Sequence, residues 1–470
     1  MTGKSPSRNP PVNRRPVAID LFAGAGGLTL GFEQAGFDVV ASVEYDPVHA
    51  AVHAFNFPNA EILCADVSRL SGADLLAAAR RGWSNHGYTE SLPKIDVIFG
   101  GPPCQGFSTI GKRLIDDSRN NLVFHFFRLI TEIKPRYFVM ENVPGMVLGG
   151  HSSILRKLIA EFEDAGYSIT LPHRILNSAH YGVPQSRRRL FLLGARRGEK
   201  AAGYPMPQFR PADELGGLKN GNGNHAELAS KLLPPIGPAV RDAILDLPNL
   251  DRFSQLLNTD SVQLSPTQFV VMSKRGSDYV RLLRNEAADP SNRAHPRIWD
   301  KDVLTSSART VHTDLSIRRF NATTPGDTEP ISRFLRLDPR GLCNTLRAGT
   351  GSERGAYTSP RPIHPELARV ISVREAARLH SLPDWFRLHA TKWHGFRQVG
   401  NSVPPLLGRA VANEIARALG VKPSKPRKAV PLGDPNLLTL TMAQAAMHFG
   451  ASSDQIPKQR NRETRKVANV

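Results

Sequence analysis

Cysteine is scarce in this chain, and no CxxC pair occurs. Its 470 residues include three widely spaced cysteines, Cys64, Cys104 and Cys343. So few thiols predict neither a disulfide framework nor a cysteine-rich zinc site; we expect no metal and a reducing compartment such as the cytoplasm. No run approaches the roughly 18 apolar residues of a membrane span, and residues 1–16 lack the apolar core of a signal peptide. We therefore expect neither a membrane protein nor a secreted one.

Acidic residues are also outnumbered. Lys plus Arg total 61 against 42 Asp plus Glu, which gives a net charge of +19. We interpret residues 1–16 as a basic, disordered N-terminal tail and residues 421–470 as a basic C-terminal extension; these ends together hold +10 of that charge. Basic ends are typical both of solubilising tails and of polyanion binders, because each neutralised phosphate releases counterions. The charge alone indicates nucleic acid without proving it.

Apolar runs and helical patterns alternate through the first 200 residues. Strand-like runs at 17–22, 39–46, 60–67, 95–101 and 136–143 are interleaved with helical patterns such as 121–133 and 152–166. This alternation predicts an α/β fold with a doubly wound, mostly parallel sheet. From about 201 to 345 the rhythm is lost among Gly, Asn and Pro, which indicates a separate irregular domain. Order returns with a capping box at Ser372 and Glu375 and a final helix over 404–419; a short helical pattern at 438–450 has no readable role.

The glycine-rich segment DLFAGAGGLTLGF, residues 20–32, lies between a predicted strand and a predicted helix. Glycines there let the backbone approach a ligand, and the helix N-terminus offers free N–H groups. Glu44 follows Gly24 by 20 residues, where an acidic side chain can hold a ribose, and Asp66 is placed to receive an adenine amino group. The turn alone is equally typical of a plain tight turn, but with both carboxylates it favours an adenosine-type cofactor.

Three further motifs follow strand-like runs. FGGPPCQGFS, residues 99–108, fixes Cys104 on a turn rigid enough to present a thiol, although an isolated cysteine is usually a small buried residue. Glu141 in MENV ends another strand, where a glutamate is normally just solvated. In QSRRRLF, which contains Gln185, Arg187 and Arg189 share one face of a strand and can address one anion or base edge. Each motif is weak by itself.

In this order, the four motifs resemble the signature of the DNA (cytosine-5) methyltransferases. The resemblance continues through 116–130, 369–384 and GNSVPP at 400–405, and covers nearly all of 17–200 and 345–420. It implies a Rossmann-like, S-adenosylmethionine-binding catalytic domain over 17–200, completed by 395–420. A smaller irregular target-recognition domain over 201–394 would hold the variable region, with Thr345–Leu346 as its marker.

The resemblance also implies the site residues and the reaction. Cys104 would add to carbon 6 of cytosine, Glu141 would serve nitrogen 3, and Arg187 and Arg189 would hold the base. Segment Gln105–Arg119 would be a mobile loop that closes over a flipped-out base. The cofactor residues carried over by motif position are Phe22, Gly24, Gly26, Glu44, Asp66, Pro103, Leu122 and Asn401.

The expected partner is double-stranded DNA, bound by a monomer that works beside a restriction endonuclease recognising the same sequence. The chain lacks the Cys-Phe-Thr tripeptide that marks a tRNA-directed branch, which favours DNA. Two alternatives stay open, an RNA cytosine-5 methyltransferase and a catalytically silent DNA-binding relative. A nicotinamide-dependent oxidoreductase would account for the glycine turn but for neither PPCQ nor ENV.

Overall fold

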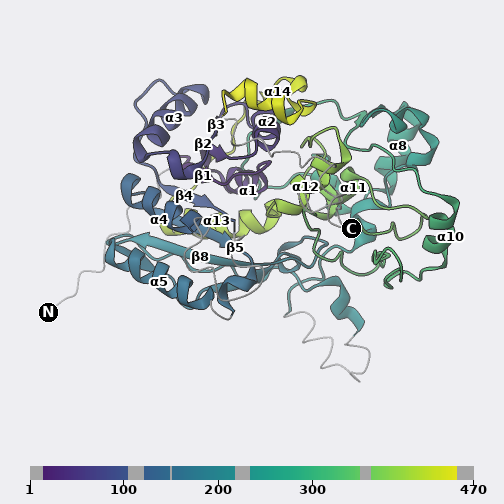
Figure 1. The fold of residues 1–470 in the computed structure, drawn as a ribbon, viewed down its shortest axis with the longest axis horizontal. Coiled ribbons are helices and arrows are strands. Elements are labelled where there is room, and N and C mark those ends of the chain that lie inside the picture. Colours follow the sequence, from purple (N-terminus) through teal and green to yellow (C-terminus); the bar gives the residue numbers. More distant parts are fainter. Residues whose placement is uncertain (1–13, 104–120, 149–150, 217–232, 350–360, 452–470) are drawn as a thin grey trace, which may run out of the picture.

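The centre of the molecule is one eight-stranded sheet. The computed structural model describes residues 14–103, 121–148, 151–216, 233–349 and 361–451 (Figure 1). The strand order is β3-β2-β1-β4-β5-β8-β6, and β7 pairs with β8 outside that path. The strands are β1 (Val17–Leu21), β2 (Asp38–Glu44), β3 (Glu61–Cys64), β4 (Val97–Gly100), β5 (Tyr137–Asn142), β6 (Tyr167–Ile169), β7 (Arg174–Asn177) and β8 (Arg188–Arg196).

The first five strands are parallel to one another, and β8 is the strand that runs in the opposite direction. β1 pairs in parallel with both β2 and β4, whereas β8 runs antiparallel to β5, β6 and β7. The strand order reverses between β1 and β4, and open α/β sheets bind ligands beyond the carboxyl ends of their strands at such a switch point. The predicted doubly wound, mostly parallel sheet is confirmed.

Helices cover both faces of this sheet. Ala18 of β1 faces α1 and α13 in one apolar cluster, while Val17 and Ile19 face α3, α4 and α5 in another. This alternation is the period of two expected for a strand that is buried on both sides. The helices are α1 (Gly27–Ala35), α2 (Pro47–Asn56), α3 (Gly72–Asn85), α4 (Asn121–Ile133), α5 (His151–Asp164) and α13 (Pro405–Leu419). We call 17–200 with 395–420 the sheet domain.

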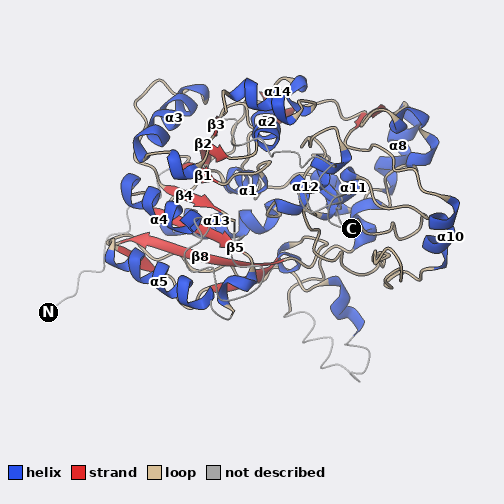
Figure 2. Cartoon of the chain, in the orientation of Figure 1, coloured by secondary structure: helices blue, strands red, loops and turns tan. Residues whose placement is uncertain are grey.

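Residues 201–394, here called the second domain, have short elements joined by long loops, as Figure 2 shows. The predicted capping box is present at the start of α11, where Ser372 and Glu375 exchange hydrogen bonds. No helix in the described ranges is both long and apolar enough to cross a membrane. The elements of this domain, with α12 reaching into the sheet domain, are α7 (Val240–Ile244), β9 (Val262–Gln263), α8 (Pro266–Arg275), α9 (Asp278–Leu283), β10 (Arg297–Ile298), β11 (Val303–Leu304), α10 (Asp314–Ala322), α11 (Val373–Leu379) and α12 (Lys392–Asn401).

The described parts of the two chain ends, residues 14–16 and 421–451, contact the folded domains. Arg14 and Arg15 fall in the predicted disordered segment 1–16, yet the Arg15 side chain is only 7% exposed, with its Nε 2.7 Å from Oδ1 of the buried Asp38, whose charge it compensates. Residues 421–451 fold back over the molecule. They form β12 (Val430–Pro431), the 3-10 turn η10 (Pro435–Leu438) and α14 (Met442–Phe449), which confirms the short helix at 438–450.

Candidate active site

The glycine loop joins β1 to α1 at the switch point. Its backbone is left-handed at Phe22 (φ 65°), Gly24 (φ 57°) and Gly26 (φ 101°). Gly26 is required there, because a Cβ would lie 2.3 Å from the Phe57 ring. No side chain caps the N-terminus of α1. Because the first N–H groups of a helix lack partners within the helix, this end suits an electron-rich ligand.

Glu44 is the last residue of β2, and its carboxylate is tied to the glycine loop. Oε2 accepts a hydrogen bond from Gly24 N at 2.7 Å, and Oε1 accepts one from Asp46 N at 2.8 Å. The residue is only 9% exposed, and this burial raises its pKa. Two oxygens that each accept one backbone N–H keep further lone pairs for a ribose hydroxyl. Two backbone contacts therefore fix the orientation of this carboxylate.

The other predicted cofactor residues surround the same edge of the sheet. Asp66 follows β3, whose Cys64 is in register with Glu44, and accepts from Ser68 N at 2.8 Å through Oδ1. Pro103 and Leu122 are partly exposed and flank segment 104–120, which lies outside the described residues. Asn401 is exposed at the last position of α12. Strand ends thus bring Glu44 and Asp66 to one edge, as the sequence predicts.

Glu141 lies at the end of the neighbouring strand β5, and it is not a solvated surface residue. It is 9% exposed and forms an ion pair with Arg189, Nε to Oε1 2.8 Å. Burial raises the pKa of Glu141, while Arg189 and then Arg187 oppose that shift. The arrangement holds a carboxyl group that keeps a proton more readily than an exposed glutamate does.

The segment that leads to Cys104 begins beside this carboxyl group. A Cβ on Gly101 would lie 2.6 Å from Glu141 Oε2, and Pro102 O accepts from Asn142 Nδ2 at 3.0 Å. Cys104 itself and the predicted loop Gln105–Arg119 lie outside the described residues. The path of the chain nevertheless starts three residues before Cys104 in contact with Glu141.

Arg187 and Arg189 have different surroundings, although they are two residues apart. Arg187 is 1% exposed and donates to Leu346 O at 2.8 Å and to Gly400 O at 2.7 Å. Burial lowers its pKa well below the usual value. Gln185 lies beside it and accepts from Leu346 N at 3.2 Å. Arg187 thus holds the segment that leaves the variable region, whereas Arg189 holds Glu141.

Sequence reasoning missed one side chain at the cofactor edge. His53 on α2 is fully buried, and its Nδ1 lies 3.2 Å from Gly24 O. A carbonyl oxygen can only accept, so Nδ1 carries the proton and donates. The spacing of His49 and His53, which puts both on one face of a helix, was the available signal. His49 Nδ1 lies 3.9 Å from Glu44 Oε1.

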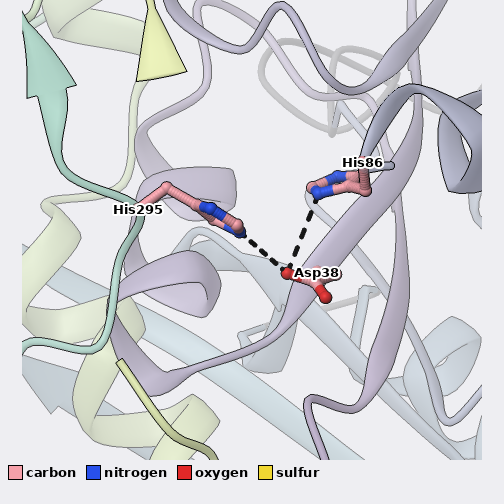
Figure 3. Close-up of side chains that lie close together, drawn as sticks. All are labelled: Asp38, His86 and His295. Atoms are coloured by element: carbon pink, nitrogen blue, oxygen red, sulfur yellow. Dashed lines mark hydrogen bonds and ion pairs between the residues drawn. The ribbon is translucent and has the colours of Figure 1, made fainter. Parts of the chain in front are cut away.

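A second polar cluster lies at the opposite, amino end of β2. Asp38, His86 and His295 bring three potential metal-ligand atoms within 4.8 Å of one another (Figure 3). Arg15 Nε already lies 2.7 Å from Asp38 Oδ1, which also pairs with His295 Nε2 at 3.0 Å, and Tyr88 donates to Oδ2. A guanidinium on the same oxygen neutralises the charge that would attract a cation. We interpret the cluster as a hydrogen-bonded junction between the sheet domain and the second domain.

Comparisons with known proteins agree with this geometry. Residues 17–417 match the family described as C-5 cytosine-specific DNA methylase. The Type II methyltransferase M.XorII of Xanthomonas oryzae pv. oryzae is 49% identical over 446 residues, which cover 94% of this chain and 95% of that protein. M.AgeI of Thalassovita gelatinovora is 30% identical over 85% of this chain and 99% of its own. A crystal structure assigned as a prophage-encoded DNA modification methyltransferase of E. coli superposes with a TM-score of 0.62, at 31% identity, over 86% of this chain and 99% of its own.

Proposed function

This chain belongs to the C-5 cytosine-specific DNA methylase family, and we propose that it methylates cytosine through a covalent bond to Cys104. The observation that supports this mechanism best is the buried Glu141–Arg189 pair at the end of β5, beside Gly101. It puts a carboxyl group whose pKa is raised by burial next to the segment that leads to Cys104.

Cys104 solves the central chemical problem. Carbon 5 of cytosine is a poor nucleophile, so it must become electron-rich before it can accept a methyl group. A thiolate that adds to carbon 6 breaks the 5,6 double bond and makes carbon 5 enamine-like. After carbon 5 is methylated, it loses its proton, the bond from Cys104 to carbon 6 breaks, and the ring regains its aromaticity.

Glu141 would donate a proton or a strong hydrogen bond to nitrogen 3 of the same ring. Thiolate attack builds negative charge on the ring unless a proton or a strong hydrogen bond reaches nitrogen 3. A carboxyl group whose pKa is raised by burial is suited to this task, and Arg189 fixes its direction. Arg187 uses two of its N–H groups on main-chain carbonyls, so we assign it to holding the wall of the pocket.

S-adenosylmethionine, the methyl donor, fits the edge formed by the glycine loop. Glu44 would hold its ribose and Asp66 its adenine, with Gly24 and Gly26 giving the backbone room beside it. Phe22, Pro103, Leu122 and Asn401 would contact it by their motif positions. The uncapped N-terminus of α1 supports this placement, because its N–H groups suit a ligand carboxylate.

Duplex DNA is the proposed substrate, with the target cytosine swung out of the stack at a cost of a few kcal/mol. Loop Gln105–Arg119 would close over it, since Lys112 and Arg113 can bind phosphate and Gly106 and Gly111 allow movement. The Type II relatives support a companion endonuclease that recognises the same sequence. We further propose that the chain acts as a monomer in the cytoplasm.

A duplex with 5-fluorocytosine at the target tests the covalent mechanism. Fluorine cannot leave carbon 5 as a proton does, so the wild type should form a stable adduct in the presence of S-adenosylmethionine, and Cys104→Ala should form none. Peptide mapping of the adduct identifies the attached residue. Attachment elsewhere, or turnover by Cys104→Ala, would refute the mechanism. A matched structured RNA is the control for substrate class, and preferential methylation of that RNA would support the RNA alternative.

A further inference from the structure

The C-terminal extension continues past residue 417, where the match to the family ends, and it folds back onto both domains. β12 pairs in parallel with β10 of the second domain. Further along, η10 packs against α2, and α14 packs against both α2 and β3. Figure 1 shows α14 lying beside α2, near β3. The extension therefore covers the helix that follows Glu44, the predicted ribose residue, and the strand that precedes Asp66, the predicted adenine residue.

Helix α2, on which the extension packs, is buried along nearly its whole length. Every residue of α2 except Ala54 is buried. A helix buried all round must have partners on all sides. β2 and β3 supply one side, and η10 and α14 supply another. The extension thus completes the burial of a helix that lies within the sheet domain.

The contacts of η10 with α2 are close and specific. Gly433 N donates to Phe55 O at 2.8 Å, and a Cβ on Gly433 would lie 2.9 Å from Phe55 Cα, so only glycine fits without a shift. Leu438, which is 3% exposed, belongs to the same apolar cluster as Val52 and Phe55. That cluster also contains Ala25 of the glycine loop. Apolar packing is therefore continuous from the extension to the loop.

His53 links α2 to the glycine loop through a hydrogen bond. Its Nδ1 donates to Gly24 O, while Gly24 N donates to Glu44. Both polar groups of the Gly24 backbone are thus fixed, one from α2 and one from β2. Burial lowers the pKa of His53 to about 4, so the ring is neutral and keeps a single N–H for this bond at neutral pH.

The extension also holds the chain just before α12. Leu438 O accepts from Ala390 N at 2.9 Å, and Leu440 O accepts from His389 Nε2 at 3.1 Å. Helix α12 follows directly and ends at Asn401. Together with the contact of α14 on β3, which leads to Asp66, these bonds connect the extension to two more of the predicted cofactor residues, in addition to Gly24.

We propose that residues 430–450 are a positioning element of the cofactor site, which acts through α2 and His53 on the glycine loop. The inference rests on the proposed S-adenosylmethionine site. The extension changes neither the substrate nor the reaction. It holds the glycine loop of the free protein in the conformation that binds the cofactor. Such preorganisation changes the affinity for the cofactor more than the rate of the bound complex.

The first experiment compares two truncations of side chains in full-length protein. Leu438→Ala removes a buried contact with α2, and Met447→Ala, at a 79% exposed position of α14, is the matched control. We expect Leu438→Ala to raise the calorimetric Kd for S-adenosylhomocysteine and the KM for S-adenosylmethionine by about fivefold or more. The kcat at saturating cofactor and the Kd for duplex DNA should stay within about twofold, and Met447→Ala should match the wild type.

The second experiment tests His53 as the connecting residue. His53→Leu removes the donor to Gly24 O and should weaken S-adenosylhomocysteine binding by about the same factor as Leu438→Ala. His53→Asn keeps an N–H donor at a similar reach and should recover most of the affinity. A purely structural role predicts instead that both variants lose thermal stability equally without such rescue.

Unchanged cofactor affinity in folded Leu438→Ala and His53→Leu proteins would overturn the proposal. If Leu438→Ala does not fold, Leu438→Val is a smaller truncation at the same contact, and the same affinity criterion applies to it. Failure of the covalent mechanism would be separate, because it appears as loss of the 5-fluorocytosine adduct while cofactor binding is normal.

Discussion

The sheet domain and the second domain bury different kinds of side chain. The centre of the sheet is made of residues such as Val97, Phe99 and Val139, all fully buried. In the second domain, Arg374 and Arg378 are among the largest fully buried side chains of the described residues. Arg378 forms ion pairs with two aspartates, Asp246 at 2.8 Å and Asp384 at 2.6 Å.

The difference follows from how each domain satisfies its backbone. Strands and long helices pair their own N–H and C=O groups, so their interior can be apolar. Long loops cannot do this, and the second domain uses arginines as donors to loop carbonyls. Arg374 donates to Thr305 O and Phe386 O, and Arg336 donates to Phe320 O and Thr323 O. Regular structure and buried guanidinium groups are therefore two solutions to one hydrogen-bonding problem.

Removing the central guanidinium of the second domain should have the largest effect. Arg378→Leu leaves Asp246 and Asp384 buried with one fewer cation, which typically costs about 3–5 kcal/mol. We expect a large loss in the free energy of unfolding, measured by urea titration. Val139→Ala in the sheet is the comparison and removes only apolar packing. A smaller loss for Arg378→Leu than for Val139→Ala would contradict the distinction between the domains.

Glu141→Gln tests the carboxyl group that we propose as the proton donor to nitrogen 3 of the cytosine. Glutamine cannot give a proton to nitrogen 3, so kcat should fall by about a hundredfold or more. Cofactor affinity should stay near wild type, whereas the melting temperature should fall, because glutamine leaves the Arg189 guanidinium without its buried carboxylate partner. Steady-state kinetics and calorimetry separate these effects. Full activity of the variant would exclude Glu141 from the reaction.

The second domain should unfold at a higher pH than the sheet domain when the protein is acidified. Arg378 and Arg369 hold the pKa of Asp384 and of Glu375 at about 2, although burial opposes them. Depressed pKa values mean that their stabilisation is present above the unfolded-state values near 4 and is lost as the pH falls toward 2, by about 2–3 kcal/mol for each group. In the sheet domain, burial raises the pKa values of Glu44 and Glu141, which therefore oppose unfolding by acid. At the junction with the second domain, His295 and Arg15 lower the pKa of Asp38 although burial opposes them, so acid should weaken the second domain and this junction first.

Tryptophan fluorescence can follow that separation. Of the four tryptophans, Trp299, Trp385 and Trp393 lie in the second domain, whereas Trp83 lies in α3. On acidification, the fluorescence change should therefore precede the loss of far-ultraviolet circular dichroism, which follows the helices and sheet of the whole chain. Coincident transitions would show that the domains unfold as one unit.

Removing residues 452–470 should have the smallest effect. This segment carries five basic and two acidic residues, and it lies beyond the packed part of the extension. If it touches phosphates, its removal should weaken binding to every duplex alike and flatten the log–log salt slope by about 0.9 for each phosphate that is no longer neutralised. Filter binding at several salt concentrations measures the slope, with melting temperature as the control. An unchanged slope would assign the DNA-binding charge to the folded domains.

Much of the sheet domain could be predicted because its signals are local. The apolar run at Val17–Leu21 and the glycine turn each depend on residues that are close in sequence, as does the capping box at Ser372 in the second domain. The order of the motifs then indicated the family. Glu44 and Glu141 were found because each ends a strand, and strand ends meet at one edge of a parallel sheet.

The remainder depends on interactions between distant residues, which no local pattern indicates. The bonds of Arg187 to Leu346 and Gly400 join residues 159 and 213 positions away. The burial of Arg15 requires Asp38 and the carbonyl of Arg293, and the role of Gly433 requires Phe55. Composition therefore suggested tails at both ends, where tertiary interactions in fact order Arg14 to Pro16 and residues 421–451.

The packing of α1 against α13 has a consequence for how the protein is made. α1 ends at residue 35 and α13 begins at residue 405, so a ribosome that adds about 5–20 residues per second delivers the partner about 20–70 s later. During that interval the side of α1 that α13 will cover, where Leu28 and Gly31 lie against Gly408, has no partner. A nascent or prematurely terminated chain therefore exposes apolar surface beside an incomplete site. The protein can become active only when its synthesis is almost finished.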